Sequence, residues 1–113
     1  MEKNLAVCSA SYKGGWHPGK VVSGKCNIGW GGKERVIRTF QVLTTKGAKF
    51  SWSKNKRAKN QVVGGKENGR SLYVCRAYYK GGSHPGKVVS GKCNIGWGGK
   101  EIKLSSYEVL TSR

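Results

Sequence analysis

Residues 17–34 of the chain read HPGKVVSGKCNIGWGGKE, and residues 84–101 repeat the same letters without a change. The two copies are offset by 67 residues along the sequence. Self-similarity over a fixed period predicts a repeat architecture, in which each unit covers apolar surface that the other cannot bury alone. We therefore expect two similar units packed into one pseudo-symmetric core.

The similarity continues on both sides of the repeated stretch, and it defines two unequal units. Val7-Cys8 correspond to Val74-Cys75, but the residues that lead into the second copy have no counterpart before the first. We divide the chain into a shortened first repeat, residues 1–45, and a full second repeat, residues 46–113. A chain of 113 residues has the size of one compact domain, so we expect the repeats to share a single core.

Glycine and short apolar stretches predict the fold class. The chain contains 18 glycines, several of them in pairs that are typical of turns and bulges, and no segment has a sustained helical period. Apolar residues alternate or cluster over short lengths between these glycines, as strands require. The expected fold is all-β, an antiparallel, sandwich-like, pseudo-symmetric tandem repeat. The expected strands cover residues 5–10, 35–43, 71–77 and 102–110.

The charge balance points to anionic partners. The chain carries 22 Lys and Arg against 5 Asp and Glu, a formal charge of +17. Such an excess attracts polyanions such as nucleic acid, sulfated glycans, anionic lipid or microbial surfaces, although it also favours solubility alone. The basic stretch 54–59 lies near Trp52 and Tyr78, a combination that fits single-stranded nucleic acid as well as a solvated loop.

The sequence contains no apolar run near the roughly 20 residues that a membrane span needs. Its first residues also lack the apolar stretch of a secretory signal. We expect a cytoplasmic location if Met1 is native, and a secreted mature chain otherwise. The four cysteines fit two disulfides in an oxidising compartment or buried thiols in a reducing one.

Enzymatic and metal chemistry find little support in the residue pattern. A phosphate-binding loop around Lys33 would need Gly and Ser or Thr where Asn27 and Glu34 stand. Each repeat offers only three spaced metal ligands, so we expect no metal site. The chain has no Asp, and each His precedes a Pro in a predicted turn. We expect no catalytic residue and no cofactor. The metal sets considered are Cys8, His17 and Cys26, and Cys75, His84 and Cys93.

Sugar recognition has a more suitable set of residues. A carboxylate accepts hydrogen bonds from vicinal hydroxyl groups, and an ammonium donates to them. Two Pro-Gly-Lys turns are predicted to expose Lys20 and Lys87 beside a strand, and a Gly-Gly-Lys-Glu-Asn-Gly turn carries Glu67. Glu34 and Glu101 fit a structural role, as turn anchors that accept from backbone N–H groups. Trp30 and Trp97 are either core residues or a flat platform for a sugar.

Several motifs in order resemble one repeat family. Residues 64–110 contain a Gly-Gly-x-Glu turn, a Leu-Tyr-Val-Cys-Arg-Ala strand, His-Pro-Gly-Lys, Gly-Gly-Lys-Glu and Tyr-Glu-Val-Leu. In this order they resemble the DM-nine repeat family, and residues 5–43 resemble the later part of the same repeat. The resemblance therefore covers nearly the whole chain.

The resemblance implies an all-β tandem-repeat fold, no catalysis, and recognition of glycans or pathogens, as in the mannose-binding oyster lectins of this family. It implies a sugar site formed by the lysine of the Pro-Gly-Lys motif, Lys87 or Lys20, and by an acidic position that falls on Lys66 or Glu67. The first repeat lacks the acidic turn, so a homodimer could complete its site. Our prediction is a lectin for mannose-type glycans, and the alternative is a cationic binder of polyanions.

Overall fold

The computed structural model of the chain describes residues 6–44 and 49–112. These residues form twelve strands and no helix. The strands are β1 (Val7–Tyr12), β2 (Gly15–Val22), β3 (Lys25–Trp30), β4 (Lys33–Ile37), β5 (Gln41–Val42), β6 (Phe50–Ser53), β7 (Val63–Glu67), β8 (Arg70–Tyr79), β9 (Gly82–Val89), β10 (Lys92–Trp97), β11 (Lys100–Leu104) and β12 (Glu108–Ser112).

The strands pair into a closed, barrel-like ring. Neighbours run in the order β2-β3-β4-β11-β10-β9-β8, and β7 pairs with both β8 and β2, which joins the two ends. Every pairing is antiparallel, so the predicted all-β antiparallel class is confirmed. The predicted repeat boundary, between residues 45 and 46, lies outside the described residues.

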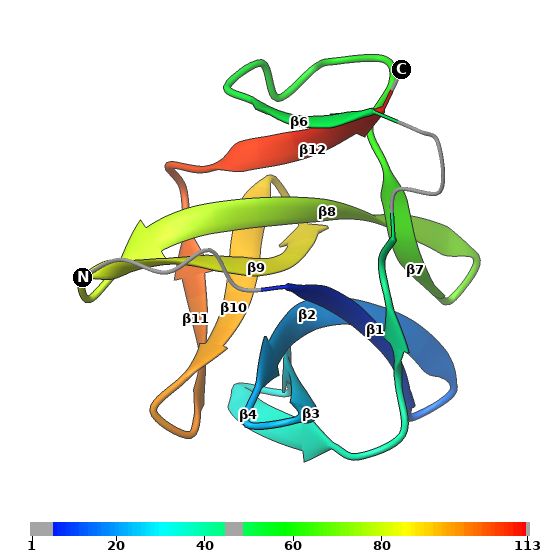
Figure 1. Cartoon of the computed structure of the whole chain (residues 1–113), viewed down its shortest axis with the longest axis vertical. Helices are drawn as coiled ribbons and strands as arrows, with labels where there is room; N and C mark the ends of the chain where they lie inside the picture. Colours follow the sequence, from blue (N-terminus) through cyan, green and yellow to red (C-terminus); the bar gives the residue numbers. More distant parts are fainter. Residues whose placement is uncertain (1–5, 45–48, 113) are drawn as a thin grey trace.

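The two repeats occupy equivalent halves of the ring. Figure 1 shows β1–β4, blue to cyan, gathered apart from β8–β11, yellow-green to orange. The halves meet where β4 lies beside β11, through two reciprocal backbone hydrogen bonds. Glu34 N donates to Gly99 O at 3.0 Å, and Glu101 N donates to Gly32 O at 3.1 Å. An approximate two-fold axis therefore passes between these strands.

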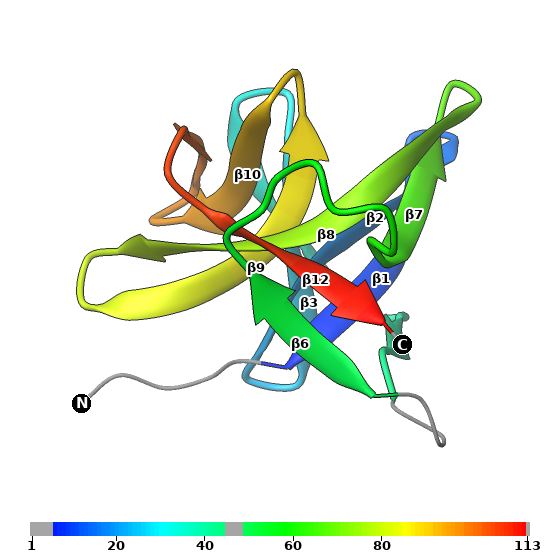
Figure 2. The same ribbon diagram turned by 90° about the horizontal axis from the view of Figure 1, so that it is seen from above.

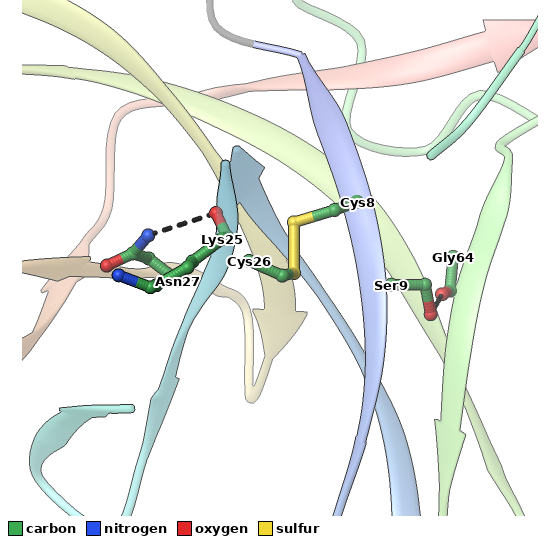
Figure 3. Close-up of a disulfide and its surroundings, with 6 residues drawn as sticks. All are labelled: Cys8, Ser9, Lys25, Cys26, Asn27 and Gly64. Atoms are coloured by element: carbon green, nitrogen blue, oxygen red, sulfur yellow. Dashed lines mark hydrogen bonds between the residues drawn. A yellow bond between two sulfur atoms is a disulfide. The ribbon is translucent and has the colours of Figure 1, made fainter. Parts of the chain in front are cut away.

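Each half has its own small core and its own disulfide. Cys8 is bonded to Cys26, and Cys75 to Cys93. Figure 3 shows the first of these linking β1 to β3, while the Ser9 hydroxyl on the other side of β1 donates to the Gly64 carbonyl of β7 at 2.6 Å. The sequence left open whether the cysteines are bonded, and the structure pairs all four.

The predicted Pro-Gly turns are wrong. Pro18 and Pro85 lie inside β2 and β9, and the turns come later, at Ser23-Gly24 and Ser90-Gly91, where the backbone φ angles are positive. Proline is tolerated because β2 begins to pair with β3 only at Lys20, beyond the residue that has no N–H to donate. The following glycine lets β2 and β3 approach closely, since a Cβ on Gly19 would clash with the Asn27 carbonyl oxygen.

The second repeat has two strands for which the described part of the first shows no counterpart. β6 extends the sheet beyond β12, as Figure 2 shows from above, and β7 forms a hairpin with β8. At Lys66, β7 also pairs with Trp16 of the first repeat. The leader of the second repeat therefore becomes part of the surroundings of the first.

Candidate functional site

Both lysines of the repeated motif are buried, contrary to the prediction that they are exposed. Lys87 is 3% exposed and Lys20 is 4% exposed. They follow the Pro-Gly pairs, and because those pairs continue a strand instead of turning, the lysines lie within the ring and not at its rim.

Each lysine is hydrogen-bonded to the histidine of the other repeat. Lys87 Nζ lies 3.0 Å from His17 Nδ1, and His17 Nε2 lies 3.1 Å from the Tyr12 carbonyl. Because a carbonyl only accepts, His17 Nε2 carries the proton, and Nδ1 accepts from the Lys87 ammonium. Lys20 and His84 are arranged in the same way at 3.0 Å. The structure thus contains two crossed lysine–histidine pairs that the sequence analysis did not foresee.

Burial controls the ionisation of both pairs. It lowers the pKa of Lys87 and Lys20, and nearby carboxylates partly oppose the effect: Glu67 and Glu101 for Lys87, Glu34 for Lys20. Burial also lowers the pKa of His17, and the Lys87 ammonium lowers it further. Neutral histidines facing charged lysines are the favoured state, since a second positive charge there would be repelled.

Glu67 links the Lys87–His17 pair to the protein surface. Its carboxylate Oε2 accepts from Trp30 Nε1 at 2.9 Å and lies 3.9 Å from His17 Nε2. The Glu67 side chain is 26% exposed, so it has both a buried neighbour and access to solvent. We call Lys87, His17, Glu67 and Trp30 the Glu67 cluster.

The structure also separates the two candidates for the acidic position. Glu67 is the last residue of β7, held by a tight turn at Asn68-Gly69 with φ angles of 52° and 77°. Successive side chains in a strand point to opposite faces, so Lys66 points away from the cluster and is exposed. Of the two, only Glu67 contacts the buried pair.

The equivalent cluster in the other half lacks a carboxylate at this position. Trp97 occupies the place of Trp30, and each packs edge-on against a tyrosine at a ring-centroid distance of 5.5 Å. Within residues 6–44 and 49–112, no carboxylate hydrogen-bonds the Trp97 indole. We call Lys20, His84 and Trp97 the Trp97 cluster. Trp97 is 37% exposed, so neither core nor platform describes it fully.

Glu34 and Glu101 anchor turns, as the sequence predicts, but each anchors the turn of the other repeat. Glu101 Oε1 accepts from Gly32 N, and Glu34 Oε1 accepts from Gly99 N, both at 3.0 Å. Because both carboxylates are held in this way beside the two-fold axis, they supply fixed negative charge to the two buried pairs.

The described residues contain neither a group of metal ligands nor a membrane-spanning helix. No three of their His, Cys, Asp or Glu side chains are grouped to hold a metal ion. No helix in the described part of the chain is long and apolar enough to cross a membrane.

Comparison with known proteins places this geometry in a family. The DM9 repeat model matches residues 1–88 and again residues 66–113. No curated protein sequence matches the chain.

One solved structure with a similar fold is that of the nematode sperm cell motility protein MFP2B, with a TM-score of 0.74 and 20% sequence identity. The match covers 95% of this chain but only 36% of MFP2B, so it supports the fold alone. The family match spans the chain and includes the lysine, histidine and glutamate positions described above. This protein therefore belongs to the DM9 repeat family.

Proposed function

We propose that the protein is a non-catalytic lectin that binds neutral, mannose-type glycans at the Glu67 cluster. The observation that carries the proposal is the half-buried Glu67 carboxylate, fixed by the Trp30 indole at 2.9 Å and still open to solvent. A fixed carboxylate beside an aromatic ring is suited to accept hydrogen bonds from two sugar hydroxyl groups.

A cavity beside Glu67 supports this proposal. It has a volume of about 350 Å³ and lies between the β7–β8 hairpin and the β9–β10 turn. Glu67, Arg70 and Ser71 supply its polar groups, and Leu72 and Val88 supply apolar surface. A monosaccharide presents the same combination of hydroxyl groups and apolar ring faces.

The role of Lys87 in this proposal differs from the one expected from the sequence. Its ammonium is buried and hydrogen-bonded to His17. In this proposal Lys87 therefore holds His17 in position, and Glu67 forms the hydrogen bonds to the sugar. Both ring nitrogens of His17 are already engaged, one by Lys87 and one by the Tyr12 carbonyl. Neither ring nitrogen of His17 is therefore left to bind a sugar hydroxyl, and in this proposal His17 has a positioning role.

The test compares Glu67→Gln with Lys66→Gln, its neighbour on the opposite face. Mannose and mannose-rich oligosaccharides are titrated at about 0.15 M salt, where diffuse charge effects are largely screened. Glu67→Gln keeps the side-chain size, so we expect normal folding and an affinity loss of about tenfold or more. Lys66→Gln should bind normally. Unchanged binding by Glu67→Gln, or equal losses in both variants, contradicts the proposal.

A second candidate function, binding of polyanions, is favoured by the charge of +17. The two functions respond differently to salt. Affinity for a polyanion falls steeply as salt rises because bound counterions are released, whereas affinity for a neutral sugar barely changes. A salt series on the unmodified protein therefore separates them.

We also propose a homodimer, because the Trp97 cluster lacks a carboxylate among the described residues. A second copy of the chain could supply one, and two sites would raise avidity for clustered glycans. Sedimentation over a concentration series tests this proposal. A monomer at every concentration would contradict it.

A further inference from the structure

A second cavity lies away from the Glu67 cluster. It has a volume of about 600 Å³ and opens between the loop after β6, the β8–β9 hairpin and the connection from β11 to β12. Lys54, Lys56 and Arg76 bring three positive charges to its wall, against the single carboxylate of Glu108. We call it the basic cavity.

Two of the three cations of the basic cavity, Lys56 and Arg76, are held in place by specific contacts. Lys56 Nζ donates to the Ser105 carbonyl and lies 4.2 Å from the centre of the Tyr107 ring. Arg76 Nε donates to Glu108 Oε1 at 2.7 Å, and its guanidinium stacks on Trp52 at 4.6 Å. Because only Nε is used for Glu108, the two terminal nitrogens of Arg76 remain as donors.

The loop that carries the lysines is itself ordered by hydrogen bonds. The Gln61 side-chain amide donates to the carbonyls of Lys56 and Ala58, at 3.1 Å and 2.9 Å. Asn55 Oδ1 accepts from Arg57 N at 3.0 Å. Because the loop backbone is already ordered, it loses less conformational freedom when a ligand binds, and this preorganisation favours binding of an anion.

The equivalent positions in the first repeat do not carry the charged side chains of the basic cavity. Arg76 and Glu108 are cross-strand partners, and the equivalent pair in the first repeat is Ser9 and Gln41. The position of Tyr78 is taken by Ser11. The basic cavity therefore belongs to the second repeat alone and is independent of the shared motif.

We propose that the basic cavity binds a saccharide that carries a sulfate or phosphate ester. Lys54, Lys56 and Arg76 provide charge-assisted hydrogen bonds to the tetrahedral anion. Tyr78, which is 64% exposed, offers a flat face to the sugar ring, and the hydroxyls of Ser83 and Ser106 are available to its polar groups. This site does not depend on the proposed neutral-glycan site at Glu67.

The experiment titrates three probes at about 0.15 M salt: a heparin-derived oligosaccharide, mannose 6-phosphate, and an unsulfated oligosaccharide of matched length. The test variant is Lys54→Gln/Lys56→Gln. Its control is Lys33→Gln/Lys100→Gln, which removes the same charge from exposed positions on β4 and β11. We expect about tenfold or greater loss for the ester-bearing probes with the test variant, and little loss with the control.

The two ester probes identify the source of the anion. Stronger binding of heparin fragments assigns sulfated glycans, and stronger binding of mannose 6-phosphate assigns phosphorylated sugars. Equal losses in the test and control variants would overturn the proposal in favour of diffuse charge. Single-stranded DNA that binds more tightly than either saccharide, with the same dependence on Lys54 and Lys56, would overturn it in favour of a nucleic acid.

Tyr78→Ala and Glu67→Gln complete the design. Tyr78→Ala removes the proposed sugar platform without changing charge, so it should weaken the ester-bearing saccharides and leave inorganic sulfate unaffected. Unchanged saccharide binding by Tyr78→Ala would contradict the sugar part of the proposal. Glu67→Gln should retain full affinity for the heparin-derived oligosaccharide, which contains no mannose, and this keeps a failure of the Glu67 site distinct from a failure of the basic cavity.

Discussion

The Glu67 cluster and the Trp97 cluster are built from the same repeated letters, yet they are not equivalent sites. Each contains a buried lysine, a histidine from the other repeat and a tryptophan at the same position. Only the Glu67 cluster is reached by β7, which brings a carboxylate to the tryptophan. The repeated motif therefore builds the shared frame, while the flanking segment determines which copy has a complete site.

Removal of the disulfides should have the largest effect, and it tests whether the two halves are equally supported. Each bond closes a loop with a sequence separation of 18, so loop entropy predicts about 3 kcal/mol for either. The core around Cys8 has fewer buried residues than the core around Cys75. We expect Cys8→Ala/Cys26→Ala to destabilise more than Cys75→Ala/Cys93→Ala in denaturant unfolding. The opposite order would show that the second half is the weaker one.

Replacement of the buried lysines is a more local test of the same comparison. Lys87→Met and Lys20→Met each leave a histidine Nδ1 without its donor, which should cost about 1–3 kcal/mol. Lys87→Met also removes the buried ammonium that Glu67 and Glu101 stabilise, whereas Lys20→Met removes the one that Glu34 stabilises. We therefore expect the larger loss of stability, and the loss of mannose binding, for Lys87→Met. Equal losses of stability in thermal unfolding would indicate that the Lys87 ammonium and the Glu67 carboxylate do not stabilise each other.

The sequence predicts the fold well, but it predicts the candidate binding site at Glu67 only in part. The duplication and the all-β class can be recognised directly in the sequence, and so can the role of the two glutamates as turn anchors, but not that each anchors the turn of the other repeat. The crossed lysine–histidine pairs cannot be recognised in this way, because their partners are 64 and 70 residues apart and depend on how the halves pack. The Pro-Gly turn signal misleads because turn chemistry is local, and the pairing of β2 with β1 overrides it.

Two equivalent glycines test the asymmetry directly. A Cβ on Gly15 would lie 3.0 Å from both His17 Nε2 and the Lys66 carbonyl, whereas one on Gly82 would come no closer than 3.5 Å to His84. Gly15→Ala should therefore cost about 1 kcal/mol or more through overpacking and weaken binding at Glu67, while Gly82→Ala stays near wild type. Equal effects of the two substitutions on unfolding would mean that β7 does not crowd the first repeat.

The pH dependence of stability is the smallest expected effect, and its sign follows from the two histidines. Burial lowers the pKa of both His17 and His84 below the ordinary value of 6.5. As pH falls below that value, the unfolded chain takes up protons that the folded histidines resist. The free energy of unfolding should therefore decrease from about pH 7 toward the lower pKa of the folded histidines, and level off below it.

His17→Asn and His84→Asn assign this pH dependence to the two clusters. Asparagine keeps an acceptor for the lysine but cannot gain a proton, so each variant should remove part of the slope between about pH 5 and pH 7 in denaturant unfolding. Glu67 and Glu101 oppose the shift at His17, and Glu34 opposes it at His84, so the two contributions need not be equal. A double variant that retains the full slope would place its origin outside the lysine–histidine pairs.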